Sequence, residues 1–164
     1  MASSDHSDMH VVDPDRTPGW RAGLLGHLLR LDPEQRRTRF LGTIDEAGLR
    51  AHVARSAPLA LVVFAPDGIV RGCAEVHRSF VPGEAEVAVS VETGWQNRGV
   101  GAALTTQATR VAQRAGLPDV RLICLRRNVP MLRIAQKLAA HALPMADWAL
   151  ALFRVEVAEA PSAP

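Results

Sequence analysis

Residues 89–102 have the sequence VSVETGWQNRGVGA, in which a predicted strand, a polar loop and the start of a predicted helix follow one another. The first N–H groups of a helix have no partner within it, and they point outward at the positive end of the helix dipole. Gly99 and Gly101 lack a Cβ atom, so an anionic group can approach the backbone closely there. The stretch therefore predicts a site for a phosphate or a pyrophosphate.

The whole chain has 164 residues, enough for one domain with a buried core and too few for two. Its hydrophobic share of 48% and its charged share of 22% are typical of a globular protein. The net charge is only +2, with basic and acidic residues interspersed, so we expect neither nucleic acid nor a membrane as a partner. We expect a flexible N-terminal tail at 1–16, a single domain at 17–158 and a flexible C-terminal tail at 159–164.

The two cysteines, Cys73 and Cys124, each lie in an apolar run that is predicted to be a strand, which is typical of buried free thiols. Neither belongs to a Cys-x-x-Cys or Cys/His cluster, so we expect no metal site and no disulfide. The N-terminal residues have no basic start and no apolar core, and no apolar run reaches membrane-spanning length. We therefore expect a cytoplasmic protein, and the sequence leaves open whether it is a monomer or a homodimer.

Hydrophobic periodicity and turn residues divide the domain into helices and strands. Helices are predicted at 20–31, from Pro33 to Gly42 after an N-cap at Asp32, and at 45–55, 98–115 and 129–140. Strands are predicted at 59–65, 69–80, 85–92, 120–125 and 148–157. Tight turns join the first three strands into an antiparallel meander, whereas the later strands alternate with helices. We expect an α/β (α+β) fold with a sheet of mixed direction, whose strands splay near the glycine loop and leave a cleft.

A family resemblance rests on three stretches of this chain. Gln96-Asn97-Arg98-Gly99-Val100-Gly101-Ala102 matches the Gln/Arg-x-x-Gly-x-Gly/Ala signature of the GNAT superfamily of acetyl-CoA-dependent N-acetyltransferases. Asn128-Val129-Pro130-Met131 resembles the family's Asn-x-x-Met segment, and residues 31–40 resemble a segment of the branch that includes bacterial protein lysine acetyltransferases. The resemblance covers roughly residues 28–157. It implies a mainly antiparallel, twisted sheet flanked by helices, with acetyl-CoA in a splayed cleft as the acyl donor.

The chain also departs from the family pattern. The usual Val-Arg-Pro opening strand is not recognisable near the N-terminus, and the Gly-Phe after the last helix is Ala139-Ala140 here. Many members have a Tyr near the thiol, and this chain contains no Tyr. A CoA thiol that resembles Cys has a pKa near ~8.5 and can leave as a thiolate, so catalysis does not require that Tyr.

The cofactor-binding residues fall into two groups. For the pyrophosphate we expect the loop and the first helical turn: Gln96, Asn97, Arg98, Gly99, Val100, Gly101 and Ala102. For the pantetheine arm we expect the edge of the preceding strand, together with a cap and an apolar wall: Val89, Ser90, Val91, Asn128 and Met131. The alternative for the two glycines is a tight turn without a ligand, which we favour less than the binding site. Asn128 and Met131 are equally typical of a helix cap and a core contact.

Acetyl transfer needs a neutral amine, whereas a free Lys has a pKa near ~10.4, so a base would help. Side chains alternate along 85–92, so Glu86 is expected on the face away from the valines. In the resembling lysine acetyltransferases a base Glu occupies the corresponding position of a Glu-x-Ala motif, and we expect Glu86 to be that base. A solvated acid on an open sheet face is the other interpretation. If Pro82-Gly83 is a two-residue turn, Ser79 lies opposite Glu86, and His77 is diagonal to it and able to tune or relay a proton. A turn one residue longer would move His77 to the other face, and a structural role is the favoured alternative for it.

The resulting prediction is an N-acetyltransferase that transfers the acetyl group of acetyl-CoA to a primary amine of a protein lysine or a small molecule. A strand N–H near Val89 is the expected oxyanion donor. A second interpretation is a non-catalytic acyl-CoA-binding domain, favoured by the missing Tyr and the altered opening strand. A nucleotide-binding module is a weaker third, because the chain has neither the Lys-Ser/Thr of a P-loop nor a full Gly-x-Gly-x-x-Gly.

Overall fold

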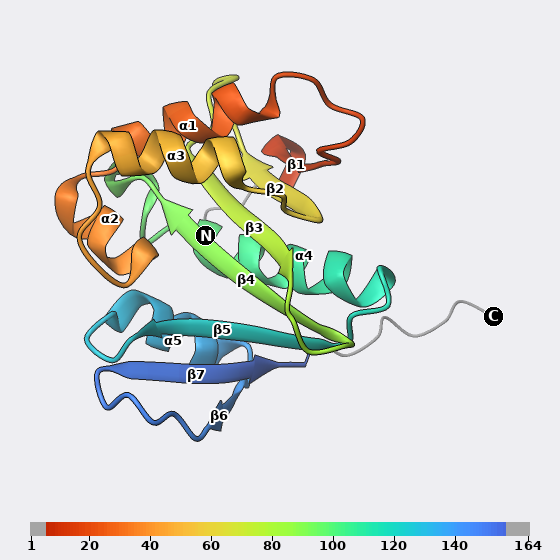
Figure 1. The fold of residues 1–164 in the computed structure, drawn as a ribbon, viewed down its shortest axis with the longest axis vertical. Coiled ribbons are helices and arrows are strands. Elements are labelled where there is room, and N and C mark those ends of the chain that lie inside the picture. The colour runs from red at the N-terminus through yellow and green to blue at the C-terminus, as the bar shows by residue number, and fades with distance from the viewer. Residues whose placement is uncertain (1–5, 157–164) are drawn as a thin grey trace.

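The computed structural model describes residues 6–156, so the predicted tail at 159–164 lies outside the described range. Within that range the strands form one sheet in the order β1-β2-β3-β4-β5-β7-β6 (Figure 1). Its strands are β1 Met9–Val12, β2 Ala60–Phe64, β3 Gly72–Arg78, β4 Glu84–Val91, β5 Asp119–Leu125, β6 His141–Leu143 and β7 Leu150–Val155. Neighbouring strands are antiparallel except β4 and β5, which are parallel. The expected mixed, mainly antiparallel sheet is confirmed.

Helices flank this sheet and connect its strands. They are α1 Trp20–Arg30, α2 Pro33–Phe40, α3 Glu46–Arg55, α4 Val100–Arg114 and α5 Val129–Lys137, with short 3-10 turns at His6–Asp8 and Thr93–Trp95. The predicted start of α2 is confirmed: the Asp32 side chain accepts from the Gln35 N–H, and the Gln35 side chain accepts from the Asp32 N–H. The end of α2 differs, because Leu41 rather than Gly42 adopts the left-handed conformation.

The N-terminal boundary of the sheet differs from the expected flexible tail at 1–16. Met9 pairs with Phe64 and Val12 with Leu61, so residues 9–12 form the antiparallel edge strand β1. The Ala65 N–H also donates to the Asp8 carbonyl over 2.9 Å. The segment Met9–Val12 is only four residues long and lies between polar residues, so the sequence pattern did not indicate a strand there. A first strand is therefore present although the family's usual opening sequence is not.

Two apolar layers lie on opposite faces of the sheet. Helix α4 covers one face, where Leu104 and Ala108 pack with Val62, Val76 and Val87. Helices α1 and α3 cover the other face, where Leu28, Leu49 and Val53 pack with Leu61 and Cys73. Side chains along a strand alternate between faces, so residues in step with Cys73 on β3 lie on the side of α1 to α3. That alternation decides which polar side chains meet in the site.

Three further expectations concern the cysteines, the last strands and the helices. Cys73 and Cys124 are buried free thiols, as expected. The strand predicted at 148–157 is shorter, Leu150–Val155, and the short strand β6 beside it was not predicted. Within residues 6–156, no helix combines the length and the apolar character needed to cross a membrane.

Candidate functional site

Strands β4 and β5 begin as neighbours and then diverge. They pair only at Glu84 with Asp119, Ala85 with Val120 and Glu86 with Arg121. Beyond Glu86 a cavity of about 390 Å³ opens between the two strands. Helix α2 lines one side of it through Gln35, Thr38 and Arg39, and helix α5 lines another through Met131 and Ile134. The predicted splay of the sheet is therefore present, and it forms a cleft whose lining includes both Glu86 and Gly101 of the glycine loop.

The backbone of β4 turns part of its hydrogen-bonding edge toward this cleft. The Ser79 N–H donates to the Glu84 carbonyl and the Glu92 N–H donates to the Arg71 carbonyl, both across to β3 or its extension. In an antiparallel pair these directions alternate residue by residue, so the peptide groups of Val89 and Val91 face away from β3. The Val91 carbonyl is already used, because the Gln35 and Gln96 side-chain amides donate to it over 3.0 and 2.9 Å. Val89 therefore offers the freest main-chain edge.

The glycine loop ends in an uncapped helix start. Gly99 is the N-cap residue of α4, with φ 80°, and no side chain caps the helix there. Asn97 also has a positive φ of 58°, which Asn tolerates better than most residues. The Arg98 guanidinium lies over the Trp95 ring, 5.0 Å from its centroid. The N–H groups of the first turn of α4 therefore remain available to an anion, at the positive end of a 15-residue helix.

Gly101 has a packing reason of its own. A Cβ atom at this position would lie 2.8 Å from Cδ1 of Ile134 on α5, so its absence leaves room for the Ile134 side chain between the two helices. Helix α5 begins at an N-cap as expected: the Asn128 side chain accepts from the Met131 N–H over 3.2 Å. Asn128 and Met131 also line the cavity. Asn128 therefore caps α5 and also lines the cavity.

Glu86 lies at the point where β4 and β5 separate, and its side chain is exposed to the cleft. The expected register of the β3–β4 hairpin was wrong. His77, rather than Ser79, pairs with Glu86, and Ser79 lies opposite Glu84. The connecting loop is two residues longer than a two-residue turn at Pro82-Gly83. A shift of two residues on one strand keeps His77 on the same face and brings it beside Glu86.

A buried carboxylate behind His77 was not found from the sequence. Glu75 on β3 is 2% exposed and forms an ion pair with Arg39 of α2. Its Oε1 atom also lies 3.3 Å from His52 Nε2 and 3.5 Å from His77 Nε2. Burial raises the pKa of the Glu75 carboxyl, but Arg39 and the two histidines outweigh it, so the pKa lies well below its usual value. Glu75 is therefore an ionised anchor between the sheet and the helices at the cleft.

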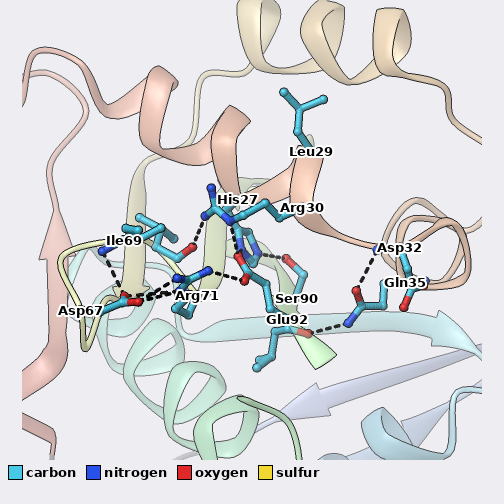
Figure 2. Close-up of polar contacts among 12 residues, drawn as sticks. His27, Leu29, Arg30, Asp32, Gln35, Asp67, Ile69, Arg71, Ser90 and Glu92 are labelled. Carbon is cyan, nitrogen blue, oxygen red and sulfur yellow. Dashed lines mark hydrogen bonds and ion pairs between the residues drawn. The ribbon is translucent and has the colours of Figure 1, made fainter. Parts of the chain in front are cut away.

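A second polar network lies at the end of β4 and includes Ser90, Glu92 and His27 (Figure 2). The Ser90 hydroxyl lies 2.9 Å from Nε2 of His27, and Nδ1 of His27 lies 3.4 Å from Oε1 of Glu92. Arg30 and Arg71 donate to the two oxygens of Glu92 over 2.8 and 3.0 Å. Burial raises the pKa of the Glu92 carboxyl, but Arg30 and Arg71 outweigh this effect, so the pKa lies below its usual value. Burial lowers the pKa of His27, although the contact with Glu92 acts in the opposite direction.

The cavity brings together most of the predicted residues. Nine of them line it: Glu86, Val89, Ser90, Val91, Gln96, Asn97, Gly101, Asn128 and Met131. Arg98, Gly99, Val100 and Ala102 lie in the adjoining loop and first turn, and His77 lies behind Glu86. Sequence reasoning missed Glu75, Arg39, His27 and Glu92. The alternation of β3 was the available signal for Glu75, since it places this carboxyl on the face covered by α1 to α3. Over the part of the chain that the structure describes, no group of three His, Cys, Asp or Glu side chains is arranged to hold a metal ion.

Comparison with known proteins points in one direction. The profile of the acetyltransferase (GNAT) family matches residues 25–140. The GNAT domain of PAT from S. lividans has a similar structure, with a TM-score of 0.74 and 17% identity over 91% of this chain and 89% of that one. The protein yncA of Salmonella typhimurium, solved with its cofactor acetyl-CoA, has a TM-score of 0.64 and 18% identity over 94% and 97% of the two chains. A GNAT-family acetyltransferase from Bacillus anthracis has a TM-score of 0.66 and 16% identity over 91% and 95%. No curated protein sequence matches the chain significantly.

Proposed function

The chain belongs to the acetyltransferase (GNAT) family, and we propose that it transfers the acetyl group of acetyl-CoA to a primary amine, on a protein lysine or a small molecule. One observation carries the proposal. A single cleft runs from the uncapped N-terminus of α4, past the free main-chain edge at Val89, to the carboxyl of Glu86. These three features match the parts of acetyl-CoA in order. The anion site suits the pyrophosphate, the strand edge suits the amide-bearing arm, and the base suits an amine that attacks the acetyl group.

The acyl donor would be held by backbone groups more than by side chains. The N–H groups that open α4, from Arg98 to Ala102, would bind the pyrophosphate with Gln96 and Asn97 beside them. The Val89 carbonyl would accept from an amide of the pantetheine arm, which would lie along β4 as a neighbouring strand does. Ser90, Asn128 and Met131 border the same part of the cleft. The Val91 carbonyl already accepts hydrogen bonds from Gln35 and Gln96, so only the N–H of Val91 would be left for the pantetheine arm.

Glu86 would act as the general base. It would take a proton from the ammonium of the acceptor, directly or through water, so that the neutral amine attacks the acetyl carbonyl directly. The Val89 N–H would donate to the oxygen that becomes negative during the attack. His77 lies opposite Glu86 and contacts the ionised Glu75. Glu75 would hold the His77 ring in place, and His77 would position Glu86 or relay its proton to solvent.

Two measurements test this proposal. Titration calorimetry should detect acetyl-CoA binding and no comparable binding of ATP, and absence of acetyl-CoA binding would exclude any acyl-CoA function. In a screen of amines that follows CoA release, Glu86→Gln should lower turnover by about 10²-fold or more at neutral pH. Glu84→Gln makes the same chemical change two residues away on β4 and should leave turnover near that of the wild type. A protein that binds acetyl-CoA but acetylates no amine would instead be the non-catalytic acyl-CoA-binding domain.

A further inference from the structure

Ser90, His27 and Glu92 are arranged as a nucleophile, a base and an orienting acid. Ser90 Oγ lies 2.9 Å from His27 Nε2, and the opposite ring nitrogen lies 3.4 Å from the Glu92 carboxylate (Figure 2). They come from two parts of the chain: His27 is on α1, Ser90 is on β4, and Glu92 follows the last residue of β4. The same order of roles, hydroxyl to imidazole to carboxylate, defines serine hydrolases on unrelated folds. Geometry therefore marks a second reactive group in the cleft.

The protonation of the three groups follows from their partners. Glu92 accepts hydrogen bonds from Arg30 and Arg71 and is ionised, so it can only accept from His27. His27 Nδ1 must then carry the proton, and Nε2 keeps its lone pair. The Ser90 hydroxyl consequently donates to Nε2, which is the direction needed to activate a nucleophile. The ring is fully buried, and burial lowers the pKa of His27, which keeps it neutral at neutral pH.

Ser90 also lies next to Val89, whose N–H is the proposed donor to the acyl carbonyl oxygen. It lines the cleft between Val89 and Val91, and the neighbouring Val89 peptide faces the gap between β4 and β5. When a hydroxyl and an N–H donor lie on adjacent residues of one strand, the hydroxyl can attack the carbon of a carbonyl group while the N–H donates to its oxygen. Glu86 lies four residues earlier on the same face. The base for an amine and the serine thus occupy different points along the cleft.

We infer that Ser90 is a nucleophile that takes the acetyl group of acetyl-CoA when no amine occupies the cleft, and that water then releases it, so that the protein also hydrolyses acetyl-CoA. This inference rests on the proposed function in needing acetyl-CoA in the cleft. It adds an activity, thioester hydrolysis, to amine acetylation.

The steps balance without any further reagent. Ser90 Oγ bonds to the acetyl carbon while its proton moves to His27 Nε2, the carbon–sulfur bond breaks, and the CoA thiolate takes that proton from Nε2. The serine now carries an acetyl ester. A water molecule attacks the ester carbon and gives one proton to Nε2, which passes it to Ser90 Oγ as the carbon–oxygen bond to the serine breaks. Acetic acid leaves and ionises in solvent, so acetyl-CoA and water become CoA and acetate.

The surroundings of Glu92 make this reaction slow compared with amine transfer. Arg30 and Arg71 share the negative charge of Glu92, and the contact with His27 is long for a hydrogen bond. The imidazolium that forms during proton transfer is therefore weakly stabilised. A neutral amine is also a better nucleophile than a hydroxyl, so transfer prevails whenever an acceptor is bound.

The experiment uses the full chain with acetyl-CoA and no amine. Thiol release above the rate of buffer alone and an acetylated peptide containing Ser90 after acid quenching are expected for the wild type. The adduct should be labile to hydroxylamine, which distinguishes an ester from an amide on Lys137, the only lysine in the sequence. Ser90→Ala should lose the adduct and lower thiol release by about 10-fold or more. Ser79→Ala is the matched control outside the cleft and should behave as the wild type.

A second variant guards against a purely structural effect of losing the hydroxyl. Ser90→Cys keeps a nucleophile of similar size, so the acetyl adduct should persist on the thiol as a thioester. Equal thiol release by the wild type and Ser90→Ala, with acetyl-CoA binding intact, would overturn the inference and leave the proposed amine transfer standing. If acetyl-CoA does not bind at all, the proposed function fails as well. If Glu86→Gln loses amine transfer while Ser90-dependent hydrolysis continues, both assignments hold.

Discussion

Glu75 on β3 and Arg39 on α2 form an ion pair that is almost withdrawn from water, with side chains 2% and 9% exposed. Arg39 lines the cleft and Glu75 does not, so the pair joins the cleft wall to the centre of the sheet. His52 of α3 and His77 of β3 complete the surroundings of the carboxylate. The position of α2 along the cleft therefore depends on a charge that the sheet supplies.

Removing this charge should destabilise the protein strongly. Glu75→Gln leaves the Arg39 guanidinium buried without its counter-ion, and breaking a buried pair on one side costs about 3–5 kcal/mol. Urea denaturation at neutral pH measures the change in the free energy of unfolding. The matched control is Glu46→Gln, which breaks an exposed pair with Arg50 and should cost no more than about 1 kcal/mol. Similar losses in the two variants would mean that Glu75 is no better insulated from water than a surface acid.

Acidification should remove stability in two stages. The folded pKa of His27 is lowered, so the unfolded chain binds the proton first and stability falls as pH drops below about 6.5. The folded pKa values of Glu75 and Glu92 are also lowered, so their stabilisation is complete above about 4.3, the unfolded value, and is lost as pH falls through the folded values. Denaturant unfolding across this pH range should show both stages. His27→Gln should remove the first, and a wild-type curve that is flat between about pH 7 and pH 5 would contradict its assignment.

The cleft was predictable from sequence because its signals are local. The valine alternation before the loop, the positive φ available at Gly99 and the caps at Asp32 and Asn128 are each decided within a few residues. The strand, the loop and the helix start followed from these signals. Their order along the chain, together with the family resemblance, predicted the mixed sheet and its divergence.

The charged networks were not predictable in the same way. Glu75 and His27 stand among apolar neighbours, and only tertiary packing decides whether such a side chain meets a partner or water. Arg39 reaches Glu75 from 36 residues away, and Ser90 reaches His27 from 63 residues away. The wrong pairing of Ser79 with Glu86 has a local cause. A Pro-Gly pair alone does not determine the length of the loop between β3 and β4.

Gly101 should matter for helix packing rather than for close approach of the phosphate. Gly101→Ala places a Cβ against Ile134 Cδ1, so the Ile134 side chain must turn away or α4 must shift, and either change alters the cleft wall beside the loop. We expect acetyl-CoA affinity, measured by calorimetry, to fall about tenfold, or about 1.4 kcal/mol. Ile134→Val deletes the clashing Cδ1 atom, so the double variant should regain most of the affinity. Gly42→Ala, where a Cβ would meet nothing within 4 Å, is the control. A loss that persists in the double variant would assign Gly101 to the ligand instead.

Asn128 combines a helix cap with a position in the cleft, and two substitutions separate these roles. Asn128→Ala removes the acceptor for the Met131 N–H and should lower the free energy of unfolding by about 1 kcal/mol. Asn128→Asp keeps a capping oxygen and favours the helix dipole, so thermal stability should be retained. Its new negative charge would lie beside the acyl-donor arm of a ligand that is itself an anion, so acetyl-CoA affinity should fall by a few-fold, and more so at low salt. If Asn128→Asp binds acetyl-CoA as the wild type does, Asn128 serves the helix alone and does not orient the pantetheine arm.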